Sequence, residues 1–205
     1  VNIQGLAGAQ VDGTIGPLDM RAQFTTSSPA NPRSVFDKDQ YANWAGGVGY
    51  TIRQGFRVGV SAYRGPYLDR QYPYYFPGEA PPRDLPATGY GLDVQWGRGP
   101  WNVYGELSHF QMAYEAIPTY NSQTGYAEAR RVLNPRWYVA ARAGYEHPLN
   151  YQVSESYEMA VGFRPAANQV LKFGFITEHY SGGPLEHPIM IQFVTNFRAF
   201  GFAGR

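Results

Sequence analysis

Residues 42–63 read ANWAGGVGYTIRQGFRVGVSAY, and this stretch decides the fold. Apolar residues alternate with small or polar ones from Ala42 to Ile52, and the alternation resumes from Phe56 to Tyr63. Between these two segments, Arg53–Gly55 suits a tight turn. Period-two alternation on both sides of a glycine-containing turn is typical of an antiparallel hairpin with one apolar and one polar face.

The same alternation recurs along the whole chain, and no segment carries the apolar stripe of an amphipathic helix. It predicts 11 strands, at residues 2–12, 18–26, 42–52, 56–63, 90–96, 101–108, 124–132, 137–146, 157–164, 171–175 and 189–196. The segments at 2–12 and 124–132 are the weakest, because neither face carries much bulk. Helix is expected only as a turn or two within loops.

The connections between these strands alternate in length. Short turns are predicted at Gly13–Gly16, Arg53–Gly55, Gly97–Pro100, Leu133–Arg136 and Pro165–Asn168. Long polar loops are predicted at Ser27–Asp39, Arg64–Pro86, Glu115–Gln123, His147–Ser154 and Ser181–Pro188. Tight periplasmic turns and longer outside loops are typical of a barrel in a bacterial outer membrane, whereas a soluble sandwich has no reason to sort its loops. We therefore predict an all-β fold: a transmembrane antiparallel up-and-down β-barrel, with residues 1–205 in one domain surrounded by outer-membrane lipid.

The composition supports a membrane barrel and excludes several other classes. Charged residues make up 16% of the 205 residues, against roughly 25% in soluble domains. The net charge of +1 argues against nucleic-acid binding, which needs a clustered basic patch. The absence of cysteine excludes disulfides and thiolate metal sites. No apolar run approaches the roughly 20 residues of a membrane-spanning helix.

The direction of the predicted strands indicates that the barrel formed by this chain is N-terminally incomplete. The first predicted strand leads into a short turn, so it begins on the outside, whereas such barrels have an even strand number and begin in the periplasm. The chain, which starts at Val1 without a methionine or leader, is then the C-terminal part of a larger even-stranded barrel. In the alternative, the segment at 2–12 is a periplasmic tail and ten strands close by themselves.

Tryptophans gather at strand ends. Trp96, Trp101 and Trp137 adjoin short turns, and Trp44 lies near the opposite end of its strand. Trp and Tyr collect where a membrane meets water, so two aromatic girdles are predicted. Core packing in a soluble sandwich is the alternative, but it does not explain the crowding at turns.

Charged side chains fall on the face opposite the apolar one. The candidate pore-lining residues are Arg57, Asp93, Glu106, Arg142, Glu158, Arg164 and Lys172. They predict a polar lumen that passes hydrated solutes, with the charges setting selectivity. In the alternative they pair into salt bridges that fill the bore, as in small barrels. The near balance of signs argues against strong ion selectivity.

Other motifs give weaker evidence about function. The loop Arg64–Pro86, rich in proline and tyrosine, suits a constriction in the pore mouth, a contact surface for a partner or sugar, or a loop packed on the rim. Ser108 and His109 invite a hydrolase hypothesis, but adjacent strand residues point to opposite faces, so we predict no catalytic residue and no enzyme. His147, His179 and His187 lack metal-ligand spacing, and we predict no metal and no cofactor.

The chain resembles Gram-negative outer-membrane porin-like barrels, in particular porin-like proteins of soil bacteria such as Acidobacteria. The resemblance is one of pattern over the whole chain, and it is carried by residues 40–50 (QYANWAGGVGY), 94–101 (VQWGRGPW), 135–142 (PRWYVAAR) and 191–197 (IQFVTNF). It implies passive diffusion of small solutes and insertion by the barrel-assembly machinery. Many such barrels end on an aromatic residue, whereas this chain continues past Phe197, which leaves the terminal assembly signal unplaced.

The first functional hypothesis is therefore an outer-membrane porin-like channel for passive diffusion of small hydrophilic solutes or ions. The alternative is a non-conducting outer-membrane barrel that acts as a scaffold or surface adhesin through its long outside loops. Porins are often trimers, and a homo-oligomer such as a trimer is one alternative for this chain. The sequence does not distinguish a subunit contact from a lipid contact on any face.

Overall fold

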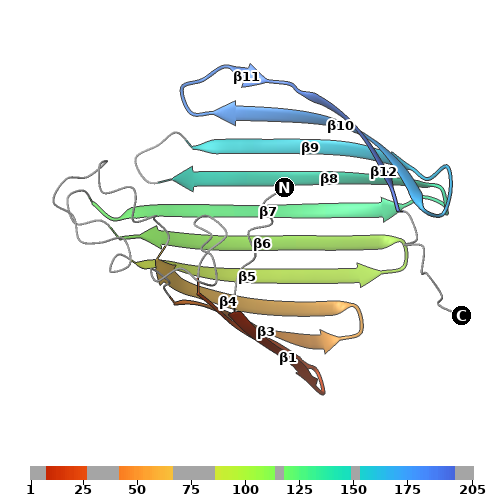
Figure 1. Ribbon diagram of the computed structural model, residues 1–205. Coiled ribbons are helices and arrows are strands. Elements are labelled where there is room, and N and C mark those ends of the chain that lie inside the picture. The colour runs from red at the N-terminus through yellow and green to blue at the C-terminus, as the bar shows by residue number, and fades with distance from the viewer. Residues whose placement is uncertain (1–7, 27–41, 67–85, 114–117, 149–152, 197–205) are drawn as a thin grey trace, which may run out of the picture.

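The computed structural model describes residues 8–26, 42–66, 86–113, 118–148 and 153–196, and none of these residues is in a helix. The strands of this part are β1 Gly8–Ile15, β2 Leu18–Thr25, β3 Asn43–Arg53, β4 Phe56–Pro66, β5 Pro86–Arg98, β6 Trp101–Met112, β7 Tyr120–Val132, β8 Trp137–Pro148, β9 Ser154–Phe163, β10 Gln169–Tyr180, β11 Leu185–Glu186 and β12 Ile189–Thr195. They form one antiparallel sheet in which sequence neighbours pair in order from β1 to β11, as Figure 1 shows, while β12 pairs with β10. The predicted all-β up-and-down architecture is confirmed.

β11 and β12 together are the eleventh strand of the prediction. Glu186 faces Glu178 of β10, and Ile189 faces Phe175 in the same register. The interruption falls at His187 and Pro188, where proline has no N–H to donate to the ladder. The amide N of Ile176 still donates to the Pro188 carbonyl oxygen at 3.0 Å. The edge of the sheet therefore runs as one strand with a break at proline.

Three of the short turns are built by glycine at positive φ. Gly16, Gly55 and Gly99 have φ values of 60°, 79° and 57°, a region that glycine enters without steric cost. Each lies in a two-residue hairpin loop, the tightest link between antiparallel strands. These turns lie at the right-hand end of the strands in Figure 1, which we call the short-turn end; the opposite end is the long-loop end.

The predicted alternation of loop lengths holds only in the first part of the chain. The connections between β2 and β3 and between β4 and β5 span residues 26–42 and 67–85, most of which lie outside the described residues. The predicted loop at 147–154 shrinks to 149–153 because β8 continues through His147 to Pro148. Part of the predicted loop at 181–188 is strand β11.

The weak strands of the prediction are present but displaced. β1, Gly8–Ile15, continues three residues past the predicted end at Asp12, so the first turn is at Gly16 and Pro17 and not at Gly13–Gly16, and residues 2–7 of the predicted strand lie outside the described residues. β7 begins at Tyr120, four residues before the predicted start, within the predicted loop 115–123. Both segments lack bulky alternating side chains, so pairing with their neighbours sets their limits.

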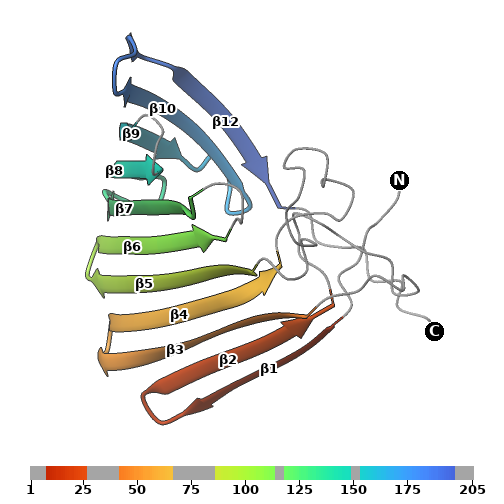
Figure 2. The ribbon, with the colours of Figure 1, turned by 90° about the vertical axis from the view of Figure 1, so that its left-hand side faces the viewer.

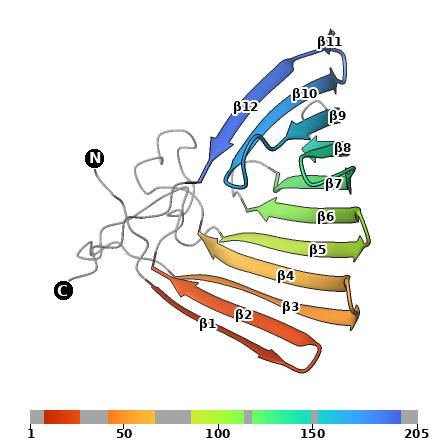
Figure 3. The ribbon, with the colours of Figure 1, turned by 90° about the vertical axis from the view of Figure 1, so that its right-hand side faces the viewer.

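The sheet is curved and open. Figures 2 and 3 show β1 and β12 at opposite ends of a wide arc, and no pairing joins them. Because successive strands are antiparallel, β1 and β12 both run toward the short-turn end. Few described apolar side chains are buried: the buried ones are Ala87, Tyr138 and Ala160. This sheet has no core of the kind that a soluble sandwich forms between two layers.

Candidate functional site

The register divides the described side chains between an apolar face and a polar face. Across five neighbouring strands the apolar face aligns Met20, Val48, Val60, Leu92 and Leu107. These side chains are exposed, Val60 by 58%. Large apolar side chains exposed over a whole sheet need an apolar environment outside it. The apolar face thus suits an apolar environment outside the sheet.

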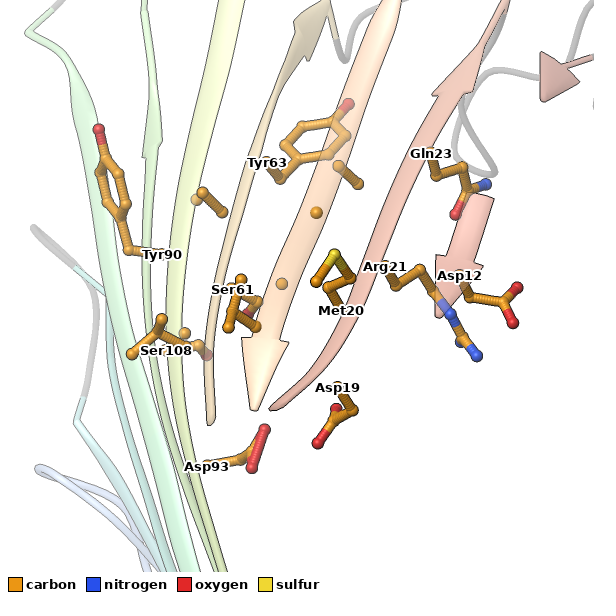
Figure 4. A pocket seen from close by; sticks show the side chains of 18 of the residues that line it. Asp12, Asp19, Met20, Arg21, Gln23, Ser61, Tyr63, Tyr90, Asp93 and Ser108 are labelled. Carbon is orange, nitrogen blue, oxygen red and sulfur yellow. The ribbon is translucent and has the colours of Figure 1, made fainter. Parts of the chain in front are cut away.

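The polar face carries the ionisable side chains and a hollow of about 770 Å³. The hollow lies over β1 to β6, and Figure 4 shows Asp19 and Asp93 at the same end of it. Asp12 and Arg21, which face each other in the β1–β2 register, also line it. Serine, tyrosine and glycine also line it, together with apolar residues such as Met20 and Phe110, and water and dissolved solutes can contact this face.

Arg57 joins two carboxylates from strands on either side of it. Its Nε and Nη2 donate to the two oxygens of Asp19 on β2 at 2.8 and 2.6 Å, and its Nη1 donates to Asp93 Oδ2 on β5 at 2.6 Å. A guanidinium that binds one carboxylate through two parallel hydrogen bonds is held in a fixed orientation. We call this group the Arg57 bridge.

Two glycines make room for the Arg57 bridge. Gly49 on β3 lies between Asp19 and Gly59 in the register, and a Cβ there would be 2.0 Å from Arg57 Nη2. At Gly59 on β4 a Cβ would be 2.5 Å from Asp93 Oδ1. The guanidinium and carboxylates therefore lie flat on the sheet, over backbone that carries no side chains.

Asp93 also has a like-charged neighbour. It pairs directly with Glu106 of β6, and no ion pair to Glu106 is found among the described residues. Like charges directly opposite on a sheet destabilise it. The Arg57 bridge offsets part of this repulsion, and a carboxylate surplus remains at the Asp93–Glu106 pair.

The arginines of β7 and β8 contact tyrosine rings. The guanidinium carbon of Arg142 lies 4.0 Å from the ring centroid of Tyr126, and that of Arg130 lies 4.8 Å from the ring of Tyr138. Arg164, just after β9, lies 5.8 Å from the same Tyr138 ring. These distances are within the range of cation–π attraction. Arg142 also faces Glu128 and Glu158 across the register, without an ion pair to either in the described part.

The predicted site residues fall into two groups. Arg57, Asp93 and Glu106 come together over β4 to β6. A second group, Arg142, Glu158, Arg164 and Lys172, lies on the polar side of β8 to β10. The sequence argument missed Asp19, which completes the Arg57 bridge. Its position on the polar side of an alternating segment was visible, but its partner lies two strands away.

The four tryptophans lie at the strand ends. Trp101 and Trp137 adjoin short turns and are each 41% exposed, and Trp44, at the long-loop end, is 60% exposed. Trp44 packs on Phe24 with centroids 4.7 Å apart, and Trp137 packs on Phe163 at 4.6 Å. Trp96 faces Phe56 and Val103 across the register. Their apolar surroundings are on the apolar face of the sheet.

Ser108 and His109 do not approach each other. Ser108 Oγ is 2.6 Å from Thr124 Oγ1 on the polar face, whereas His109 faces Tyr90 and Gln123 on the apolar face. Within the described ranges no group of three or more His, Asp or Glu side chains could hold a metal ion. The same part of the chain contains no helix that is long and apolar enough to cross a membrane.

Comparison with known proteins identifies the fold. No protein-family model and no curated protein sequence matches the chain. A porin structure refined at 1.8 Å matches with a TM-score of 0.68 at 8% identity, covering 91% of this chain and 60% of the porin. An anion-selective porin from Comamonas acidovorans matches with a TM-score of 0.64 at 8% identity, covering 91% of this chain and 54% of that one.

A third match is the outer-membrane channel DcaP of Acinetobacter baumannii, with a TM-score of 0.60 at 8% identity and coverage of 94% and 63%. The chain thus spans about 54 to 63% of the length of the three structures. These likenesses confirm the predicted porin-like, outer-membrane type of β-barrel fold. The narrower likeness to acidobacterial proteins stays a prediction.

Proposed function

We propose that this chain forms a large part of the wall of a porin-like channel in the bacterial outer membrane, through which small hydrophilic solutes or ions diffuse. The observation that carries the proposal is the division of one curved sheet into an exposed apolar face and a charged, water-accessible face. A barrel with that division meets lipid on the outside and water on the inside. Passive diffusion needs no chemistry, so we propose no enzymatic activity.

We further propose that additional strands complete the barrel. An unpaired sheet edge within lipid leaves backbone N–H and C=O groups without partners, so a membrane sheet must close. The described sheet is open at β1 and β12. Residues 1–205 then belong to one barrel domain that is larger than the described wall, and its full strand number sets the bore.

The proposed selectivity is a preference for cations. Carboxylates of the described polar face are Asp12, Asp19, Asp93, Glu106, Glu128, Glu146, Glu158, Glu178 and Glu186. Cations of the same face are Arg21, Arg57, Arg130, Arg142, Arg164 and Lys172. The excess of carboxylates lowers the energy of a cation beside this wall. The predicted pore-lining role of Arg57, Asp93, Glu106, Arg142, Glu158, Arg164 and Lys172 is part of this proposal.

We also propose Trp44, Trp96, Trp101 and Trp137 as members of two interfacial girdles. Their placement at strand ends on the apolar side matches the depth at which aromatic rings meet headgroups. Lipid and the assembly machinery are the partners that this location implies. A trimer is compatible with the fold.

Conductance of the full-length protein in a planar bilayer tests the channel. We expect discrete ohmic steps, whose size reports the bore. A silent bilayer with confirmed insertion would contradict the channel and favour the scaffold or adhesin, in which the outside loops bind a partner.

The reversal potential in a KCl gradient tests selectivity. We expect cation preference in the wild type and a lower preference in the double variant Asp93→Asn/Glu106→Gln. The matched control is Glu155→Gln, because Glu155 faces Tyr145 and His179 on the apolar side. Unchanged selectivity in the double variant would remove these two residues from the lining.

A further inference from the structure

The apolar face carries a group of exposed arginines at its short-turn end. Arg53, Arg98 and Arg131 lie on this face, at or next to the last residue of β3, β5 and β7, and Arg136 lies in the β7–β8 turn at the same end. All four are exposed. The ion pairs found among the described residues belong to Arg57, so none of the four has a carboxylate partner there. We call Arg53, Arg98, Arg131 and Arg136 the arginine belt.

Carboxylates are absent from this end of the described apolar face. The carboxylate on that face is Glu155, near the start of β9, and it lies at the long-loop end. Asp12, Asp19 and Glu128, which are closer to the short turns, point to the polar face, as their pairing with Arg21, Gly49 and Arg142 requires. The arginine belt therefore makes a positive surface that no described acidic side chain neutralises.

Aromatic rings lie between the arginines. Trp101 faces Arg98 on one side and Arg131 on the other in the register. The guanidinium carbon of Arg131 lies 5.3 Å from the Trp101 ring centroid, and that of Arg53 lies 6.0 Å from the ring of Phe56. A ring beside the guanidinium holds the long side chain against the apolar face and leaves its N–H groups free to bind an anion.

The location specifies which anion this surface meets. In an outer-membrane barrel the short turns face the periplasm, so the arginine belt lies at the level of the periplasmic leaflet's headgroups. Arginine binds phosphate oxygens through paired N–H donors, and tryptophan favours the same depth. We propose that the arginine belt is a binding surface for the phosphodiester headgroups of anionic phospholipids, with Arg98, Trp101 and Arg131 at its centre.

The proposal concerns the outside of the wall, so it does not depend on conduction through the lumen. Each basic residue at a membrane surface attracts anionic lipid by an amount that corresponds to about a five-fold preference. The attraction is electrostatic and should fall when salt shortens the Debye length from about 10 Å at 0.1 M to about 3 Å at 1 M.

Electron paramagnetic resonance of spin-labelled lipids tests the proposal on the full-length protein in phosphatidylcholine vesicles. Phosphatidylglycerol and phosphatidylcholine carry the same label, and their relative association with the barrel is measured. We expect the wild type to prefer phosphatidylglycerol by about five-fold or more, and 1 M salt to reduce this preference. Equal association of the two lipids with the wild type would overturn the proposal without any variant.

The double variant Arg98→Gln/Arg131→Gln should bring the preference close to one, whereas Arg98→Lys/Arg131→Lys should keep most of it. Arg64→Gln is the matched control, because Arg64 faces Trp44 and Thr88 on the same apolar face but at the long-loop end. An equal loss in Arg64→Gln and in the double glutamine variant would overturn the assignment to this end. Displacement of the lipid by millimolar glycerol 3-phosphate would show a site for free phosphate esters and would also overturn it.

Discussion

The two parts of the polar face hold their arginines in different ways. Over β2 to β5, Arg57 is bound by the carboxylates of Asp19 and Asp93. Over β7 to β9, Arg130 and Arg142 lie against the rings of Tyr138 and Tyr126. A carboxylate cancels the charge of the arginine that it fixes, whereas a ring fixes the arginine and leaves its charge intact. The same residue type therefore contributes little positive potential in the first part and a full charge in the second.

The glycines differ in the same way. Gly49 leaves space for the end of a flexible arginine, whereas Gly162 lies beneath the ring of Tyr138, which is buried to 7% exposure. A ring over glycine is a recognised device for covering bare backbone in sheets. We infer that a Cβ at Gly49 would break the ion pair of Arg57, whereas a Cβ at Gly162 would lower stability by displacing a buried ring.

The largest expected effect is the substitution Gly162→Ala. A Cβ at Gly162 would be 2.0 Å from Tyr138 Cε1 and 2.1 Å from Tyr138 Cζ, and a rigid ring cannot bend away. We expect a loss of about 1–3 kcal/mol, the usual cost of overpacking, measured by urea unfolding of the folded barrel in lipid.

Gly105→Ala is the matched control for this substitution, because its Cβ would meet its nearest atom, the carbonyl oxygen of Tyr126, at 3.6 Å. Equal stability losses in the two variants would show that the ring over Gly162 is not the cause.

The next effect separates the two kinds of arginine. Arg57→Gln leaves Asp19 and Asp93 without their shared cation. The stability of the barrel should therefore fall, and the repulsion of anions should rise. Arg142→Gln also removes one positive charge, but it leaves a neutral ring behind. We expect both variants to raise cation preference in reversal-potential measurements, and Arg57→Gln alone to lower the urea midpoint clearly. A larger fall in the midpoint for Arg142→Gln would reverse the comparison.

A smaller effect is expected for the ring itself. Tyr126→Leu keeps an apolar side chain but removes the π face, so Arg142 should lose about 0.5–1 kcal/mol of attraction. A double-mutant cycle with Arg142→Gln measures the coupling directly. Tyr104→Leu serves as control, because Tyr104 faces Gln95 and Glu128 across the register and contacts no described guanidinium. A coupling of zero would mean that Tyr126 and Arg142 are only neighbours.

The smallest effect should come from salt. Raising KCl from 0.1 to 1 M shortens the Debye length from about 10 Å to about 3 Å, so charges of the wall act over a shorter range. We expect cation preference to fall in the wild type and the difference between Arg57→Gln and Arg142→Gln to narrow. Selectivity that is independent of salt would assign it to the bore rather than to these charges.

Most of the fold could be predicted from the sequence because apolar and polar residues alternate along a strand that has one apolar face. Trp44, Val48 and Tyr50 alternate with small residues, and that pattern alone assigns β3 and its faces. The end of β1 was placed too early because Gly13 and Thr14 give no such contrast, and only pairing with β2 defines where the strand ends. Loop lengths near the C-terminal strands were overestimated because His147 and Pro148 look like loop residues but continue the ladder.

The site was less predictable than the fold. The charges of the polar face followed from alternation, but the Arg57 bridge depends on which residue of β2 lies beside which residue of β4, across an intervening strand. Tyr138 of β8 is likewise contacted from both sides, by Arg130 of β7 and by Arg164, which follows β9. Such contacts depend on the register between strands, and for Arg57 and Asp19 on the register across an intervening strand, which a single sequence does not state.

The common direction of β1 and β12 restricts how this wall can close. Two strands can pair antiparallel only when they run in opposite senses, so a direct seam between these edges would be parallel. A second copy inserted with the same orientation in the membrane would meet the same obstacle at each junction. If every pair in the closed barrel is antiparallel, the strands that complete it must be odd in number. The parity of any strands that close the sheet is thus a countable property that a structure of the closed barrel would check.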